Sequence, residues 1–157
     1  MAWLFIAVQG VLLLAVIALP GPDTPASSAL RGIGLVVEIV GMVIILIGAA
    51  QLGISLNILP TPNKHGRLRT GGLYRLVRHP IYFGVMVFVV GSALRAPTVA
   101  RVLAALALGA LFHFKAAWEE LQLNAKYPDY AEYAARTPPI FPLKLPGRSP
   151  DGVPRPR

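Results

Sequence analysis

The sequence contains no cysteine, which excludes disulfide bonds, thiolate nucleophiles and zinc sites built from thiolates. Charged residues are also scarce, since they make up 14% of the 157 residues and only seven of them are acidic. Its histidines, His65, His79 and His113, are too scattered along the chain to show the spacing of metal ligands. We therefore expect no structural metal in this protein.

Apolar residues, in contrast, make up 55% of the sequence and occur in long blocks without amphipathic spacing. Such blocks are typical of membrane proteins. The sequence predicts an all-α fold, a polytopic transmembrane helical bundle, as a single domain over residues 1–142. The proline-rich segment 143–157 is expected to be a disordered tail.

Apolar runs predict about four spans. The run 2–20 is uncharged and long enough for a hydrocarbon layer of roughly 30 Å, and no Lys or Arg precedes it, which argues against a cleaved signal peptide. A second span is expected over 33–54, after a loop at 21–29, and a tight helical hairpin is expected from the runs 80–94 and 98–116.

The helix of the fourth run is expected to continue to about Lys126, which predicts a cytosolic helical extension. Pro80 suits the first turn of a helix, where its missing N–H has no cost, so Arg78 and His79 are expected at the start of the third span. The second span has glycine at 34, 41 and 48, and this spacing of seven favours close packing against a neighbouring helix.

The distribution of Lys and Arg predicts the orientation. Twelve cations cluster in the loop 57–79 and in the C-terminal region, and the positive-inside rule places them in the cytoplasm, leaving Arg31, Arg95 and Arg101 outside. Both termini are then cytoplasmic, and the plasma membrane of a prokaryote is the expected location. The net charge of +8 matches this topology and anionic lipid headgroups. We expect no nucleic-acid partner, because no nucleic-acid-binding module is present.

Glu38 is an acidic residue inside the second predicted span. A charged residue at this depth costs about 2.5 to 3.5 kcal/mol on insertion scales, so its side chain is expected to face the bundle and to find a partner. Two interpretations remain open: a structural bond to a neighbouring helix, or a role near a substrate.

Residues 60–142 carry motifs that resemble those of the isoprenylcysteine carboxyl methyltransferase and phospholipid methyltransferase superfamily, whose members are integral membrane enzymes. The matching residues are Thr70-Gly71-Gly72-Leu73-Tyr74, Arg78-His79-Pro80-x-Tyr82-x-Gly84, Glu119-Glu120-x-x-Leu123, and Tyr127-Pro128-x-Tyr130-x-x-Tyr133 with Arg136. The family also carries a basic residue shortly after the position of Arg136, where this sequence has Pro138-Pro139-Ile140.

The resemblance implies S-adenosylmethionine as cofactor, S-adenosylhomocysteine as product, and a membrane lipid or another lipophilic or small acceptor with a carboxylate, amine or thiol. Because the cofactor carries a sulfonium, an ammonium, a carboxylate and a ribose diol, its pocket needs both signs of charge and apolar walls. The candidates for catalysis are Arg78, Arg136 and Glu119. The candidates for cofactor binding are His79, Tyr82, Gly84, Glu120, Tyr74 and Tyr130.

Elementary chemistry favours particular roles for some of these residues. Glu119 and Glu120 point about 100° apart on a helix, so we expect one to bind the cofactor and the other to orient a basic partner. The ring of Tyr82 or Tyr130 is expected to face the sulfonium. The first N–H groups of the helix that begins at Pro80 suit the carboxylate of the cofactor.

Other interpretations compete with this one. Taken singly, Arg78, His79 and the tyrosines are typical of anchors at a membrane interface, and Lys115 and Glu119 have the spacing of a helical ion pair. An Arg-His-x-x-Tyr-x-Gly element also occurs in sterol-type membrane reductases, which use NADPH. A non-enzymatic membrane adaptor is the third alternative. The sequence gives no indication of the oligomeric state.

Overall fold

The computed structural model describes residues 2–22, 26–53 and 68–142. Within these ranges the chain is helical and contains no strand, which confirms the all-α prediction. The predicted disordered tail at 143–157 and the cations Lys64 and Arg67 of the loop predicted to be cytoplasmic lie outside the described residues.

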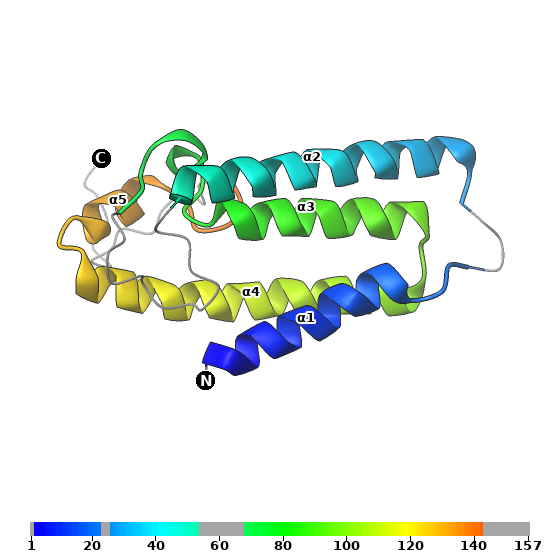
Figure 1. Ribbon diagram of the computed structural model, residues 1–157, viewed down its shortest axis with the longest axis horizontal. Coiled ribbons are helices and arrows are strands. Elements are labelled where there is room, and N and C mark those ends of the chain that lie inside the picture. The colour runs from blue at the N-terminus through cyan, green and yellow to red at the C-terminus, as the bar shows by residue number, and fades with distance from the viewer. Residues whose placement is uncertain (1, 23–25, 54–67, 143–157) are drawn as a thin grey trace, which may run out of the picture.

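Four long helices run antiparallel to one another in chain order (Figure 1). Helix α2 packs along α3, and α1 packs along α4, with α3 and α4 in contact between the two pairs. The N-terminus of α1, the start of α3, the end of α4 and the short α5 all lie at one end of the molecule (Figure 1). The elements are α1 (Ala2–Ala18), α2 (Ser28–Leu52), the 3-10 helix η2 (Gly72–Arg75), α3 (Pro80–Arg95), α4 (Val99–Lys126) and α5 (Tyr130–Arg136).

Helix boundaries agree with the sequence patterns except at the start of α2. This helix begins at Ser28, within the segment expected to be a loop, because the Ser27 hydroxyl accepts a hydrogen bond from the N–H of Leu30 at 3.2 Å and caps the first turn. Pro80 begins α3 as predicted, and α4 continues to Lys126 as predicted. Two short helices, η2 and α5, go beyond what the sequence predicts.

Within the described ranges, two helices, α2 and α4, are long and apolar enough to cross a membrane. Two further helices, Trp3–Ala18 and Pro80–Arg95, are apolar but shorter. The count of four spans therefore stays a prediction.

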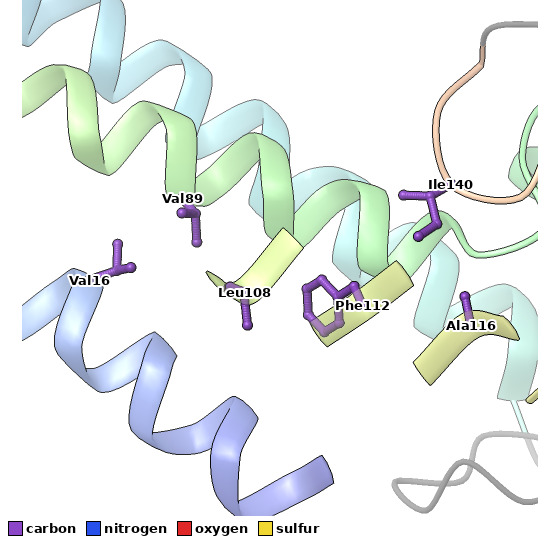
Figure 2. Close-up of a cluster of buried hydrophobic side chains, with 6 residues drawn as sticks. All are labelled: Val16, Val89, Leu108, Phe112, Ala116 and Ile140. Atoms are coloured by element: carbon purple, nitrogen blue, oxygen red, sulfur yellow. The ribbon is translucent and has the colours of Figure 1, made fainter. Parts of the chain in front are cut away.

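Side chains from three helices and one loop form the buried apolar core (Figure 2). Helix α1 contributes Val16, α3 contributes Val89, and α4 contributes most of the remainder. Ile140, which follows α5, belongs to the same cluster and so fixes the C-terminal segment against the bundle. The three core residues of α4 are Leu108, Phe112 and Ala116.

Glycines bring α2 and α3 into backbone contact, as the spacing of seven predicts. A Cβ placed on Gly41 would meet the backbone N of Phe88 and, at 2.7 Å, the carbonyl of Gly84. A Cβ on Gly84 would in turn meet the backbone N of Ile45 at 2.9 Å. Because the obstacles are backbone atoms, these positions require glycine.

Glu38 finds its partner in this helix pair. One carboxylate oxygen accepts a hydrogen bond from Nη1 of Arg95 at 2.6 Å. Arg95 is the last residue of α3, so the ion pair lies at the opposite end of this helix from Arg78 and His79. The geometry is that of a structural bond between helices, the first of the two interpretations left open above.

Candidate functional site

Arg78 and Glu120 form the centre of a polar cluster at the end of the bundle that carries α5. The guanidinium donates from Nε to one carboxylate oxygen at 3.0 Å and from Nη2 to the other at 2.8 Å. Its Nη1 donates to the backbone carbonyls of Ala134 at 2.7 Å and Thr137 at 3.1 Å. Arg78 thus joins the start of α3 to α4 and α5, and in this arrangement it orients Glu120 through a bidentate, charge-assisted pair.

Proline carbonyls hold the backbone just before α3. The N–H groups of Arg78 and His79 donate to the carbonyls of Pro138 and Pro139 at 2.9 and 2.8 Å. The segment that departs from the pattern of the superfamily therefore has a structural part in the site, because it fixes the two residues that precede Pro80.

His79 lies between the two glutamates. Its Nε2 is 3.1 Å from an oxygen of Glu120, and its Nδ1 is 3.7 Å from an oxygen of Glu119. Glu119 accepts a hydrogen bond from the hydroxyl of Tyr82 at 2.8 Å through that same oxygen, Oε2. Among the described residues, Oε1 of Glu119 has no hydrogen-bond partner, so one oxygen of this partly exposed carboxylate is accessible to water or to a ligand.

The ring of Tyr82 is surrounded by other groups. It stacks with His79 and Phe112, at centroid separations of 5.2 and 4.8 Å and interplanar angles of 3° and 5°. The ammonium of Lys115 lies 5.2 Å from its centroid. The ring therefore has a cation of the chain itself in contact, and a contact of Tyr82 with the sulfonium stays a prediction.

Tyrosine hydroxyls tie η2 to the neighbouring elements. Tyr74 donates to the carbonyl of Gly48 at 3.4 Å, and Tyr133 donates to the carbonyl of Tyr74 at 2.6 Å. The side-chain oxygen of Gln51 accepts the N–H of Leu73 at 2.9 Å. Tyr74, expected as a cofactor ligand, thus connects α2, η2 and α5.

Tyr130 differs from these tyrosines. It is 3% exposed, and its hydroxyl is buried without a hydrogen-bond partner in the described part of the chain. Burial, with the nearby charge of Glu120, raises its pKa above the usual value, so the hydroxyl keeps its proton at neutral pH. Burial likewise raises the pKa of Tyr133 to about 12. A buried hydroxyl that lacks a partner is costly, and a ligand can supply the missing bond.

Two predicted site residues lie outside the cluster. Arg136 is exposed on α5 and pairs with Glu132, four residues before it, at 3.1 Å. It faces away because Tyr130 and Tyr133 occupy the buried side of this short helix. Gly84 packs against α2 rather than against the glutamates, since α3 turns this position toward Gly41.

Lys115 and Gln9 are additional polar residues beside the site. Lys115 is 4% exposed, and its ammonium donates to the side-chain oxygen of Gln9 at 2.7 Å. The expected helical ion pair with Glu119 is not formed between the described atoms. The position of one cation inside an apolar helix was the available signal for Lys115, but nothing local to α1 could indicate that Gln9 is its partner.

This chain is similar to a known family of proteins. The sequence model of a family described as phospholipid methyltransferase matches residues 30–130, which contain the Arg78, His79, Glu119 and Glu120 cluster. Within the described residues, no group of three or more His, Asp or Glu side chains could hold a metal ion.

Two curated relatives are also similar to this chain. The cobalt-zinc-cadmium resistance protein CzcN of Cupriavidus metallidurans is 34% identical over 80 residues, which are 50% of this chain and 37% of that protein. The nickel-cobalt-cadmium resistance protein NccN of Alcaligenes xylosoxydans xylosoxydans is 32% identical over 122 residues, or 76% of this chain and 53% of that protein. The matches therefore span about half or less of the length of these relatives.

Proposed function

The chain belongs to the phospholipid methyltransferase family, and we propose that it is an integral membrane methyltransferase that uses S-adenosylmethionine. The acceptor is a lipophilic or small molecule with a carboxylate, amine or thiol. Transfer takes place at the cytoplasmic membrane face, in the plasma membrane of a prokaryote, with both termini in the cytoplasm. The observation that supports this most is the convergence of the start of α3 and the end of α4 on one polar cluster.

The residues of this cluster fit the cofactor. Its polar parts carry both signs of charge, and the cluster offers two glutamates beside an arginine and a histidine. Two of its polar atoms are left for a ligand, the buried hydroxyl of Tyr130 and Oε1 of Glu119. When bound, S-adenosylmethionine supplies an electrophilic methyl group on a positively charged sulfur.

The residues of the chain take the following roles in this proposal. Arg78 positions Glu120, which binds the cofactor together with His79, and Tyr130 donates or accepts one further hydrogen bond. Glu119 contacts the reacting groups, because one of its oxygens is fixed by Tyr82 and the other is available. An amine or thiol acceptor has to lose a proton, and Oε1 of Glu119 is the atom that receives it.

Methyl transfer needs little covalent chemistry from the protein. The acceptor, the methyl carbon and the sulfur have to be aligned, so positioning and the exclusion of water supply most of the rate. The stacked rings of Phe112, which is fully buried, and Tyr82, which is partly buried, lie beside the glutamates and provide such a water-poor environment.

Binding of S-adenosylhomocysteine or NADPH to the detergent-solubilised protein, measured by calorimetry, tests the proposal. We expect S-adenosylhomocysteine to bind and NADPH not to bind. Binding of NADPH alone would favour a membrane reductase of the sterol-reductase type, and binding of neither would favour a membrane adaptor. A labelled methyl group then identifies the acceptor among membrane lipid extracts.

Labelling of single cysteines tests the orientation, since the natural sequence has no cysteine to remove. Ser27→Cys lies at the start of α2 and Asp129→Cys at the start of α5. We expect a membrane-impermeant maleimide added outside intact cells to label the first variant and not the second. The reverse pattern would invert the proposed topology.

A further inference from the structure

Lys115 is a buried cation that none of the sequence motifs includes. It lies on α4 one turn before Glu119, next to the core residues Phe112 and Ala116. Its ammonium contacts the ring of Tyr82, whose hydroxyl bonds to Glu119. Lys115 is thus placed between the polar cluster and the apolar core.

The ammonium is incompletely satisfied. It carries three N–H donors, of which the structure pairs one with the oxygen of Gln9 at 2.7 Å. Among the described residues it forms no ion pair: the oxygens of Glu120 are bound to Arg78 and His79, and Glu119 is close enough to act on its charge but not within salt-bridge distance. A buried ammonium is stable only when it is paired, so a negatively charged oxygen would complete its surroundings.

Gln9 brings a second element into the site. It belongs to α1, which lies outside the residues that the family model matches. Its amide oxygen accepts a hydrogen bond from the ammonium of Lys115, 106 positions away in the sequence. Residues of both α1 and α4 therefore determine where this ammonium lies. Both helices expose apolar side chains, among them Leu14 of α1 and Leu106 of α4, so a lipophilic acceptor finds an apolar surface beside Lys115.

We propose that Lys115, held by Gln9, is the acceptor-recognition residue and binds an oxyanion of a lipophilic acceptor. The oxyanion is a carboxylate that itself receives the methyl group or a phosphate beside the reacting group. A protonated amine without an oxyanion is repelled by the ammonium. This inference rests on the proposed methyl transfer, since it names the acceptor side of that same site. The alternative is that the bond between Lys115 and Gln9 only clamps α1 to α4.

Calorimetry with palmitate, dodecyl phosphate and dodecylamine as probes tests the inference in detergent. We expect the wild-type protein to bind at least one of the two anionic probes, which identifies the oxyanion as carboxylate or phosphate, and not to bind dodecylamine. Lys115→Gln should weaken binding of that anionic probe at least tenfold. Lys126→Gln, a matched loss of charge on the same helix, should leave it unchanged.

Gln9→Glu separates recognition from clamping. The new carboxylate pairs with Lys115 and keeps or strengthens the link between α1 and α4, but it also occupies the ammonium. We expect a thermal midpoint equal to or above that of the wild type, together with at least tenfold weaker binding of the anionic probe. Gln9→Leu removes the positioning bond and should weaken binding less than Lys115→Gln does.

The inference is overturned if the wild type binds neither anionic probe, if dodecylamine binds as well as they do, or if Gln9→Glu and Lys115→Gln bind the anionic probe like the wild type. S-adenosylhomocysteine affinity is measured on the same samples and should be equal in the wild type and Lys115→Gln. If the wild type does not bind S-adenosylhomocysteine, the methyltransferase proposal is contradicted. If S-adenosylhomocysteine binds but the anionic probes do not, only the role proposed for Lys115 is contradicted.

Discussion

Arg78 and Glu120, separated by 42 positions in the sequence, are joined by two parallel hydrogen bonds of 3.0 and 2.8 Å. Their side chains are only 11% and 22% exposed. The pair connects the segment just before α3 to the last third of α4. The two carbonyls that Arg78 also contacts, those of Ala134 and Thr137, connect it to α5 and its C-terminal cap. The guanidinium of Arg78 therefore fixes the start of α3, the end of α4 and α5 relative to one another.

Glu120→Gln should weaken both the fold and the site. The amide can accept from one nitrogen of Arg78 but cannot balance its charge, so we expect a loss of about 1.5 to 3 kcal/mol in unfolding free energy. Affinity for S-adenosylhomocysteine should fall at least about fivefold, equivalent to roughly 1 kcal/mol. Denaturation followed by circular dichroism, and calorimetry, measure the two effects.

Glu132→Gln is the matched control for this change. It removes an ion pair with Arg136 that is exposed on both sides, at 72% and 71%. Such pairs contribute little, so stability should stay within about 0.5 kcal/mol and cofactor affinity should not change. Equal effects of the two substitutions would contradict the importance given to Glu120.

Tyr130→Phe should lower affinity without lowering stability. The hydroxyl has no partner in the described residues, so its removal costs the fold nothing and relieves an unsatisfied buried group. If the hydroxyl binds the cofactor, S-adenosylhomocysteine affinity should fall about five- to tenfold, roughly 1 to 1.4 kcal/mol. Calorimetry and thermal unfolding of the same preparation test both parts.

Tyr133→Phe, in contrast to Tyr130→Phe, should lower stability. Its hydroxyl donates to the carbonyl of Tyr74 at 2.6 Å, so the substitution should destabilise the protein by about 1 kcal/mol. A Tyr130→Phe variant that keeps full affinity would remove Tyr130 from the proposed site.

Gly41→Ala should separate α2 from α3. The added methyl group meets backbone atoms of Phe88 and Gly84, and overpacking of this kind costs about 1 to 3 kcal/mol. Gly32→Ala, on the same helix, places its methyl group in open space and should stabilise the helix by about 0.5 to 1 kcal/mol. Thermal unfolding in detergent should therefore shift in opposite directions, and a similar shift for both would refute the close packing.

Glu38→Gln should affect stability alone. The ion pair with Arg95 lies at the other end of α3 from the candidate site, and Arg95 is 46% exposed, so we expect a loss of about 1 kcal/mol. A double-mutant cycle with Arg95→Gln isolates the interaction between the two side chains. Reduced affinity for S-adenosylhomocysteine in Glu38→Gln would instead support a role in the site.

Local sequence was sufficient to predict most of the helices. Apolar runs longer than about 15 residues cannot remain in water or form strands of ordinary length, so they predict helices. Pro80 marks the start of α3 because its ring fits only the first turn. The start of α2 was missed because the Ser27 cap lies within a segment rich in glycine, proline and serine, which is typical of loops.

Sequence motifs also identified the family, and with it the residues that meet at the polar cluster. The motifs did not indicate which of their residues lie in the polar cluster and which contacts each residue makes. Gly84 occurs in the same motif as Arg78, and Arg136 occurs with Tyr130, yet Gly84 packs against α2 and Arg136 is exposed. A motif gives residue types at fixed spacing, whereas the side of a helix that becomes buried depends on the neighbouring helices.

The sequence by itself determined the helical class, the family and the central polar residues of the candidate site, because hydrophobic runs and short motifs are encoded by neighbouring residues. Only the tertiary structure decided which of these polar atoms are paired and which have no partner among the described residues. Arg78 donates hydrogen bonds to α4 and α5, and Lys115 donates one to Gln9 of α1. The hydroxyl of Tyr130 has no partner within the part of the chain that the structure describes. These contacts join residues tens of positions apart, and side-chain packing between helices selects them.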